Sequence, residues 1–205
     1  MAPAWLDWAQ RLSALAQAGL TFAESPYDIE RYTAIRTIAA EMIAHGAGSD
    51  ADRVLDLLAG DVGYATPKVD ARGVVFRDGK ILLVQERSDG LWTLPGGWAD
   101  VGDSPADAVV REIREESGFE TRATKLLALL DRNRHGHPPH VNHIYKVFLR
   151  CEIVGGSPTT SHEIQGVDFF AEDEIPDLSL TRTMPAQVAR MFEHDRHPDW
   201  PADFD

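Results

Sequence analysis

Residues 97–119 read Gly97-Trp98-Ala99-Asp100-Val101-Gly102-Asp103, then seven residues, then Arg111-Glu112-Ile113-Arg114-Glu115-Glu116-Ser117-Gly118-Phe119. Ser104 is a suitable helix cap, and Gly118 permits the left-handed turn that ends a helix, so we predict a helix between them. Within that helix, Glu112, Glu115 and Glu116 stand at positions i, i+3 and i+4. Their three carboxylates therefore share one face.

An acidic helix face has two interpretations. Like charges at this spacing destabilise a helix by a few tenths of a kcal/mol per pair. On spacing alone a solvated acidic face is the ordinary explanation. The alternative is a site for a hard cation, because carboxylate oxygens suit Mg²⁺ or Mn²⁺. The residues around the helix favour the cation site.

Residues 97–119 resemble the Nudix box, Gly-x5-Glu-x7-Arg-Glu-U-x-Glu-Glu-x-Gly-U, where U is a bulky aliphatic or aromatic residue. One defined position departs from it, because Asp103 stands where the family has Glu. The resemblance implies that Glu112, Glu115 and Glu116 bind divalent metal and that one of them orients water. It also implies that Arg111 and Asp103 support the loop. Independently, Gly97 would let a backbone carbonyl approach the metal.

On the N-terminal side, residues 1 to about 60 have helical periodicity. We expect a first helix from Pro3 to a stop at Gly19, and a second that Ser25 caps, with Asp28 completing a capping-box pattern, and that His45-Gly46 closes. A third helix should cover residues 52–59, before a linker at 60–67. The residues at roughly helical spacing are Ala4, Leu6, Trp8, Leu12, Leu15 and Ala16 in the first helix, whereas one face of the second is lined by Ile29, Tyr32, Ile35, Ala39 and Met42.

After Pro67 the pattern changes to short strands. Strands at 69–77 and 80–86 flank Asp78-Gly79, a strong hairpin signal. Further strands are expected at 126–131, 143–152 and 167–170, with a last helix at 185–194. We predict an α+β protein in which residues 1–66 form a helical domain and residues 67–205 a Nudix domain. The resemblance implies a mixed β-sheet sandwiched between helices for the latter.

The resemblance extends beyond the box. Residues 10–42 look like the helical N-terminal domain of a Nudix subgroup that acts on nucleoside diphosphates linked to a second moiety, X. That subgroup includes bacterial CDP-choline pyrophosphatase and many ADP-ribose pyrophosphatases, and its members are dimers associated through these helices. The stretches 92–100, 131–133 and 178–183 are similar too. A homodimer is therefore expected.

Several candidates lie outside the box. Glu163 is either a further ligand or general base, or a solvated loop residue. Arg132 and Arg134 could clamp phosphate or X, although a flexible loop is the default for that segment. Its histidines, 135, 137, 140 and 143, match no common zinc spacing. Trp98, like Trp92, either stacks on a base or packs. Arg72 and Glu86 could line a substrate cleft, but alternation does not say which face is inward.

Composition narrows the class of protein. The 205 residues include 33 acidic and 20 basic side chains, for a net charge of −13. That balance disfavours DNA as a partner and would repel a polyphosphate unless metal ions bridged the two. No stretch has the apolar length of a membrane span, and Asp7 and Arg11 argue against a secretory signal. One cysteine, Cys151, is expected to be a core thiol and fits a cytoplasmic location.

Together these features predict Mg²⁺-dependent hydrolysis of a CDP-choline-like or ADP-ribose-like diphosphate, and Mn²⁺ is expected to substitute for Mg²⁺. Three alternatives stay open at this point. One is a housecleaning hydrolase of nucleoside triphosphates or RNA ends. Another is a ligand sensor that keeps the fold without catalysis, although the acids of the box are intact. The third is a chain that acts chiefly as an interaction module through its helical segment.

Overall fold

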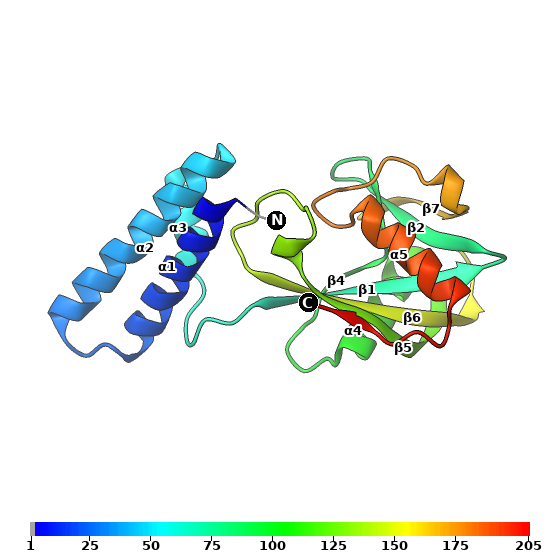
Figure 1. Ribbon diagram of the computed structural model, residues 1–205, viewed down its shortest axis with the longest axis horizontal. Helices are drawn as coiled ribbons and strands as arrows, with labels where there is room; N and C mark the ends of the chain where they lie inside the picture. The colour runs from blue at the N-terminus through cyan, green and yellow to red at the C-terminus, as the bar shows by residue number, and fades with distance from the viewer. Residues whose placement is uncertain (1–2) are drawn as a thin grey trace. The chain divides into compact units, whose positions relative to one another are not determined.

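The computed structural model describes residues 3–205 and divides the chain into two compact units (Figure 1). One contains the chain up to Lys68 together with Pro138–His143, and the other contains Val69–His137 and Ile144–Asp205. The first two residues of the predicted N-terminal domain lie outside the described residues. Within residues 3–205, no helix combines the length and apolar character needed to cross a bilayer.

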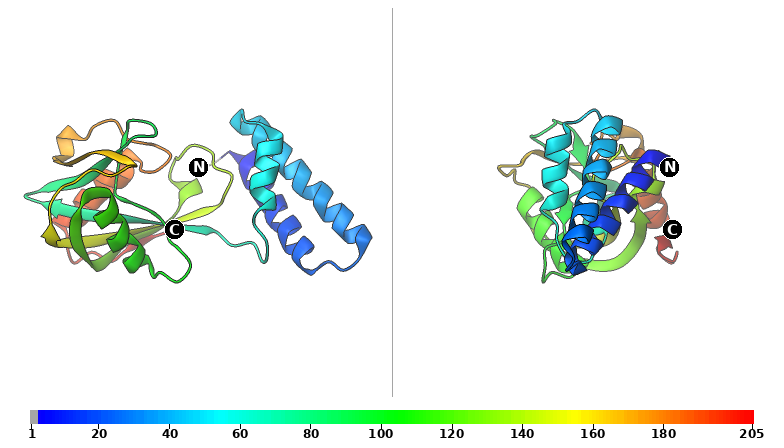
Figure 2. Two further views of the ribbon diagram at one scale, coloured as in Figure 1. Left: turned by 180° about the vertical axis from the view of Figure 1, so that it is seen from behind. Right: turned by 90° about the vertical axis from the view of Figure 1, so that its left-hand side faces the viewer.

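The first unit is a group of three helices, α1 (Ala4–Phe22), α2 (Pro26–Ala47) and α3 (Ala51–Ala59), which lie side by side (Figure 2). Their core joins small and aliphatic side chains of all three helices: Leu6, Ala9, Ala40, Ile43, Ala44 and Val54. Val141 of the 138–143 segment packs against this core, and the Gln10 side-chain amide donates to the His140 carbonyl at 3.0 Å.

The ends of the first two helices differ from the prediction. Helix α1 continues through Gly19 to Phe22, and α2 continues through Gly46 to a left-handed cap at Gly48, with φ +64°. The two internal glycines serve close packing instead of termination. A Cβ atom on Gly19 would stand 2.4 Å from the Tyr32 ring, and one on Gly46 would stand 2.4 Å from the Trp5 ring.

The residues that recur at helical spacing in these helices are only partly the ones that the structure buries. In α1 the buried residues are Leu6, Ala9, Ser13 and Ala16, and in α2 they are Ala39, Ala40, Ile43 and Ala44. Trp8, Leu15 and Ile29 are exposed instead. Alanines let helices approach closely, so they occupy the contact that periodicity had assigned to larger residues. Ser25 does stand at the N-cap of α2, but its side chain makes no capping hydrogen bond.

The second unit is built on an eight-stranded sheet with the order β3-β2-β1-β6-β5-β8. Strand β4 pairs with β1 and β7 with β2. Strands β1 and β2 pair antiparallel around Asp78-Gly79, as predicted, whereas β5 and β8 are parallel, so the sheet is mixed. The strands are β1 (Lys68–Arg77), β2 (Lys80–Glu86), β3 (Trp92–Thr93), β4 (Gly96–Trp98), β5 (Phe119–Asp131), β6 (Ile144–Gly156), β7 (Ile164–Phe170) and β8 (Asp203–Phe204).

Strands β5, β6 and β7 are longer than the sequence indicated, β7 beginning at Ile164. Strand β5 begins at Phe119, directly after Gly118, whose φ of +76° reverses the chain from helix into sheet. Strand β6 continues to Gly156 because it pairs with β5 as far as the Phe119–Gly156 register. The early part of β5 is mostly polar, with only Phe119 and Ala123 apolar up to Lys125, which hid it from a search for apolar runs.

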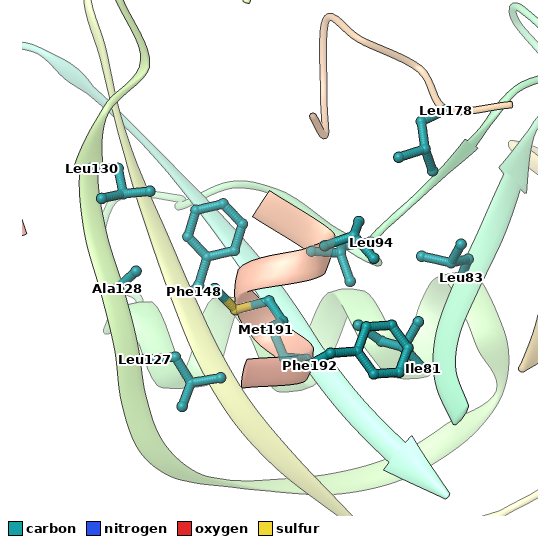
Figure 3. Packing of buried hydrophobic residues seen from close by; sticks show 12 residues of the cluster. Ile81, Leu83, Leu94, Leu127, Ala128, Leu130, Phe148, Leu178, Met191 and Phe192 are labelled. Atoms are coloured by element: carbon teal, nitrogen blue, oxygen red, sulfur yellow. The ribbon is translucent and has the colours of Figure 1, made fainter. Parts of the chain in front are cut away.

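Helices α4 (Pro105–Ser117) and α5 (Pro185–Arg196) cover opposite faces of the sheet (Figures 1 and 2). Ile81 and Leu83 of β2 pack in one core with Met191 and Phe192 of α5 (Figure 3). Leu82, between them in the strand, packs in the other core with Val109 and Ile113 of α4. Successive strand residues point to opposite faces, so a continuous apolar run fits a sheet that is covered on both sides. The predicted mixed sheet between helices is confirmed.

Candidate active site

A cleft of about 710 Å³ opens in the second unit. Its walls come from β1, β2, β4, α4, the loop before β7 and the loop before α5. Seven residues singled out in the sequence line it: Arg72, Glu86, Gly97, Trp98, Glu112, Glu116 and Glu163. Carboxylates from three different elements therefore meet at one place.

Helix α4 places Glu112 and Glu116 in this cleft. A capping box fixes its start: the Ser104 hydroxyl accepts the Asp107 N–H at 3.1 Å, and the Asp107 carboxylate accepts from the Ser104 backbone N–H. The Gly118 turn fixes its end. Between these ends Ile113 packs under the sheet, which turns the neighbouring carboxylates toward the cleft.

Glu116 is buried and is held by the backbone of the adjoining loop. Its Oε2 atom accepts the Gly96 N–H at 2.7 Å. Gly96 itself has φ +133°, and a Cβ atom there would stand 2.1 Å from the Ala71 carbonyl oxygen. The local sequence Pro95-Gly96-Gly97 therefore allows a backbone N–H to come close enough to hold this carboxylate.

Burial of these carboxylates is only partly compensated. It raises the pKa of Glu116 to about 8, although Arg72 and the Gly96 N–H both oppose the shift. Burial also raises the pKa of Glu112, against the effect of Arg111. A divalent cation would stabilise the charged form of both groups. These donors fit such an ion, since hard cations prefer oxygen.

Gly97 leaves the space beside Glu112 open. A Cβ atom at this position would stand 3.6 Å from the Glu112 carboxylate oxygen Oε2 without meeting any backbone atom that closely. The carboxylates of Glu112 and Glu116 and the backbone carbonyl of Gly97 would not complete the coordination of a metal ion. Among residues 3–205 no group of three or more His, Cys, Asp or Glu side chains is arranged to hold a metal by itself. Mg²⁺ accepts such sites, because it usually keeps several waters and takes substrate phosphates as further ligands.

Arg111 joins the helix to the loop that precedes it. Its Nε and one terminal nitrogen lie 3.3 and 3.2 Å from Asp103 Oδ2, and the other terminal nitrogen donates to Glu112 at 2.7 Å. Asp100 accepts a further bond at 3.2 Å. The shorter Asp103 side chain therefore still reaches the arginine. Glu115 lies outside the lining of the cleft, is about half exposed, and lies 3.7 Å from Arg111.

Arg72 reaches the cleft from a buried polar network. Its Nε donates to Asp70 at 2.7 Å, and a terminal nitrogen donates to the Leu94 carbonyl at 3.1 Å. The fully buried ammonium of Lys146 contacts Asp70 at 2.5 Å, and burial lowers the pKa of Lys146 to about 8. We did not foresee Asp70 or Lys146. The alternation Asp70-x-Arg72 inside an apolar strand was a signal for the first of them.

Arg182 also lines the cleft, although it was not among the predicted site residues. Its Nε lies 3.0 Å from Glu86 Oε1, and it lines the cleft together with Arg87 and Ser88. It falls within the 178–183 stretch of the family resemblance, which was the available signal.

Residues 132–137 do not contribute to the lining of the cleft. Arg132 is buried and its guanidinium lies 3.3 Å from the Thr181 carbonyl. Arg134 lies in another hollow, of about 350 Å³, with Tyr145 and Phe204. His137 is buried between the Leu180 carbonyl and Gln187. The first half of the predicted loop contains the short 3-10 helix η1 (Arg132–Arg134).

The remaining candidates have clear positions. Trp98 is about half exposed in the cleft, whereas Trp92 packs edge-on against Phe170 with ring centroids 4.8 Å apart. Glu163 lies on the loop before β7 with an exposed side chain. Cys151 is buried in the core, as expected, and burial raises its pKa to about 12.

Comparison with family models gives two matches that together span most of the chain. Residues 3–58 match the model described as a UDP-X-like, N-terminal oligomerisation domain of Nudix proteins. Residues 67–193 match the NUDIX domain.

Similar proteins extend over both regions. A curated protein of Bacillus subtilis (strain 168), named "Putative ADP-ribose pyrophosphatase YjhB", is 47% identical over 98% of this chain and 97% of its own length. A crystal structure of a UDP-X diphosphatase superposes with a TM-score of 0.64 at 32% identity over 98% of both chains. An ADP-ribose pyrophosphatase from Streptococcus suis 89-1591 superposes with a TM-score of 0.63 at 41% identity, covering 68% of this chain and all of that one.

Proposed function

The chain belongs to the Nudix hydrolase family, and from that premise we propose that it hydrolyses the diphosphate bond of a nucleoside diphosphate linked to a second moiety X. The relatives named for ADP-ribose and for UDP-X support this substrate class. The products would be a nucleoside monophosphate and phosphorylated X. One observation carries the proposal: carboxylates of Glu86, Glu112, Glu116 and Glu163 converge on one cleft that also contains fixed arginines.

We assign the metal to the acidic side of this cleft. Glu112 and Glu116, with the Gly97 carbonyl, would hold Mg²⁺ or Mn²⁺, and Glu115 is the third ligand that the family resemblance implies. When bound, the metal supplies neutralisation of the diphosphate and a lowered pKa for a coordinated water. With its charge in place, the net charge of −13 no longer opposes an anionic substrate.

The other residues of the cleft divide the remaining tasks. Arg72, fixed by Asp70, holds a positive charge beside the carboxylates and would bind a phosphoryl oxygen. Glu163 lines the cleft from an exposed loop, where its carboxylate lies 3.3 Å from the exposed His162 ring, and we assign it the role of accepting the proton of the attacking water. Trp98 presents an exposed aromatic face that suits a nucleobase. Arg132, buried with its guanidinium on the Thr181 carbonyl, would act on the substrate only indirectly.

The substrates to be assayed follow from these comparisons. We propose ADP-ribose and UDP-linked sugars as the first candidates, because relatives bear those names over nearly the full length or the whole catalytic unit. CDP-choline, which the sequence predicted, and nucleoside triphosphates belong in the same panel. Products identified by mass show which bond breaks.

Metal dependence is tested by a variant and by a chelator. Glu116→Gln removes the charge of the buried carboxylate but keeps its size and its capacity to accept the Gly96 N–H. We expect turnover with Mg²⁺ to fall by roughly 100-fold or more, as for loss of an essential electrostatic group. Excess chelator should have the same effect on the wild-type protein, measured as initial rate.

The matched control is Glu152→Gln, a glutamate of β6 that pairs with Arg122 on the surface, 2.9 Å away. It makes the same chemical change far from the lining of the cleft, and its rate should stay at the wild-type value. Turnover that persists in Glu116→Gln with an intact fold, or in excess chelator, contradicts the metal assignment.

We further propose that residues 1–66 form a dimerisation element. Its match to an oligomerisation domain supports this, as does an apolar stripe on α1. Trp8, Leu15 and Phe22 follow one another at intervals of seven residues and are 56%, 65% and 73% exposed. Seven-residue spacing keeps side chains on one helix face, where they can meet a second helix. Exposed apolar patches of this kind mark interaction sites.

A further inference from the structure

Arg182 lies on a segment that is tied firmly to the wall of the cleft. The Trp92 N–H donates to the Asp177 carbonyl at 3.0 Å, and the Ser179 N–H donates to the Trp92 carbonyl at 2.8 Å. At the other end of the segment, the hydroxyls of Thr93 and Thr183 are 2.9 Å apart and fully buried. The backbone that carries Arg182 is therefore fixed on both sides.

The guanidinium of Arg182 is held from behind by three side chains. One terminal nitrogen donates to Asp89 Oδ2 and to the Ser179 hydroxyl, both at 3.0 Å, and the other donates to the Ser88 hydroxyl at 3.2 Å. Asp89 is itself fixed, because it accepts from the Ser179 hydroxyl at 2.7 Å and from the Leu91 N–H at 3.0 Å. A planar guanidinium with three such bonds has a set orientation.

These bonds leave part of the guanidinium for a ligand. An arginine has five N–H donors, and three of those of Arg182 hydrogen-bond within the described part of the chain. Its Nε lies 3.0 Å from Glu86, and its side chain is 29% exposed in the cleft. Arg72 also makes three hydrogen bonds, to Asp70 and the Leu94 carbonyl, but its side chain is almost fully buried, so Arg182 is the more accessible of the two cations.

We propose that Arg182 binds a phosphoryl oxygen of the substrate and that Asp89 is the residue that positions it. The inference rests on the proposed function, since it names a contact of that same substrate. The cleft is lined by more carboxylates than arginines, so an anionic substrate needs a pre-oriented cationic donor as well as metal. If Arg182 only neutralised Glu86, one contact would be enough. The three further hydrogen bonds, to Asp89, Ser88 and Ser179, fix the orientation of its planar guanidinium.

The test is a comparison of steady-state constants in wild type, Arg182→Lys and Arg182→Gln. We expect Arg182→Gln to raise KM for the best conjugate by roughly 10-fold to 100-fold, the range for loss of a hydrogen bond to a charged group. Arg182→Lys keeps the charge but loses the fork, so its KM should be intermediate. In both variants kcat should stay within about threefold of wild type, because the contact is present throughout the reaction.

The KM values of single and double variants test whether Asp89 acts through Arg182. Asp89→Asn should raise KM in the wild-type background and have no further effect in Arg182→Gln, which is the signature of a residue that acts through another. Arg122→Gln, an exposed arginine of β5 paired with Glu152, is the matched control and should leave KM unchanged. Thermal unfolding of each variant verifies that the fold is kept.

A binding measurement separates this proposal from the proposed function. The probe is α,β-methylene adenosine diphosphate with Mg²⁺, titrated calorimetrically. Weaker binding by Arg182→Gln than by wild type supports the Arg182 contact even where no conjugate is hydrolysed, and in that case the proposed function alone fails. Normal hydrolysis with an unchanged KM in Arg182→Gln overturns the Arg182 contact alone. A fall in kcat at constant KM also overturns it, since Arg182 then acts through Glu86. No binding and no hydrolysis by the wild type overturns both.

Discussion

Two adjacent glycines in the cleft have different physical reasons for being glycine. Gly96 has φ +133°, and a Cβ atom there would collide with the Ala71 carbonyl oxygen at 2.1 Å. Gly97 has no such collision, and a Cβ atom there would only come to 3.6 Å from the Glu112 carboxylate. The first glycine is thus required by the backbone, whereas a methyl group at the second would stand in ordinary contact with a proposed metal ligand.

The two positions should respond differently to the same substitution. We expect Gly96→Ala to lower the unfolding free energy by about 1–3 kcal/mol, because it adds strain in a conformation that L residues rarely adopt. Gly97→Ala should leave the melting temperature near wild type but weaken activation by Mg²⁺. Thermal unfolding and the Mg²⁺ dependence of the rate measure the two effects. An equal loss of stability in both variants would contradict this division.

At the scale of one element, the starts of helices α4 and α2 can be compared. Ser104 and Ser25 both precede a proline at the first turn of a helix, so the sequence presents them as equivalent caps. Only Ser104 accepts a hydrogen bond from the helix, at 3.1 Å from the Asp107 nitrogen. The difference lies in side-chain orientation, which the sequence pattern does not contain.

Removal of the two hydroxyls tests this difference. Ser104→Ala should reduce the unfolding free energy of the catalytic unit by about 1 kcal/mol, the usual cost of losing an N-cap. Ser25→Ala should change the unfolding free energy by only a few tenths of a kcal/mol, within the range for uninvolved surface positions. Urea unfolding followed by circular dichroism measures both. A loss in Ser25→Ala as large as that in Ser104→Ala would show that the capping bond is not the cause.

The elements differ in how far the sequence predicted them. Strands β1 and β2 follow from an apolar run on either side of Asp78-Gly79, and α4 follows from its cap and its terminal glycine. The inward faces of α1 and α2 did not follow, because close contact between helices selects small residues and glycines there. Periodicity reports where large apolar side chains are, and these helices keep several of them outside.

The cleft was predictable only where its residues are close in sequence. Glu112 and Glu116 lie one helical turn apart, so their shared face was certain from spacing. The network behind Arg72 joins Asp70 to Lys146, 76 positions away, and no local pattern announces such a contact. Arg182 reaches Glu86 across a similar separation. Side-chain networks of this kind depend on the register of the finished sheet.

At the scale of the whole molecule, each unit has its own core, and the exposed stripe of α1 is available to a partner. We expect the wild-type protein to be a dimer at micromolar concentration. The double variant Trp8→Gln with Leu15→Gln should shift the mass measured by light scattering to that of a monomer, because buried aromatic anchors dominate such interfaces.

Leu57→Gln is the control for this prediction. Leu57 is a similarly exposed leucine on α3, outside the stripe, at 58%. The mass of that variant should remain that of the wild type. A wild-type monomer at micromolar concentration, or a dimer that survives in the double variant, would rule out the stripe as the interface.

The two-sided burial of β2 has a consequence for the chain before it folds. Ile81, Leu82, Leu83 and Val84 form an uncharged, strand-prone run. Such runs self-associate into cross-β aggregates when exposed. Lys80 and Glu86, at the two ends of the strand, supply the flanking charges that discourage this. Ile81, Leu82 and Leu83, which pack against α5 and α4 in the folded protein, therefore belong to a run that favours cross-β association by composition until the two helices cover it.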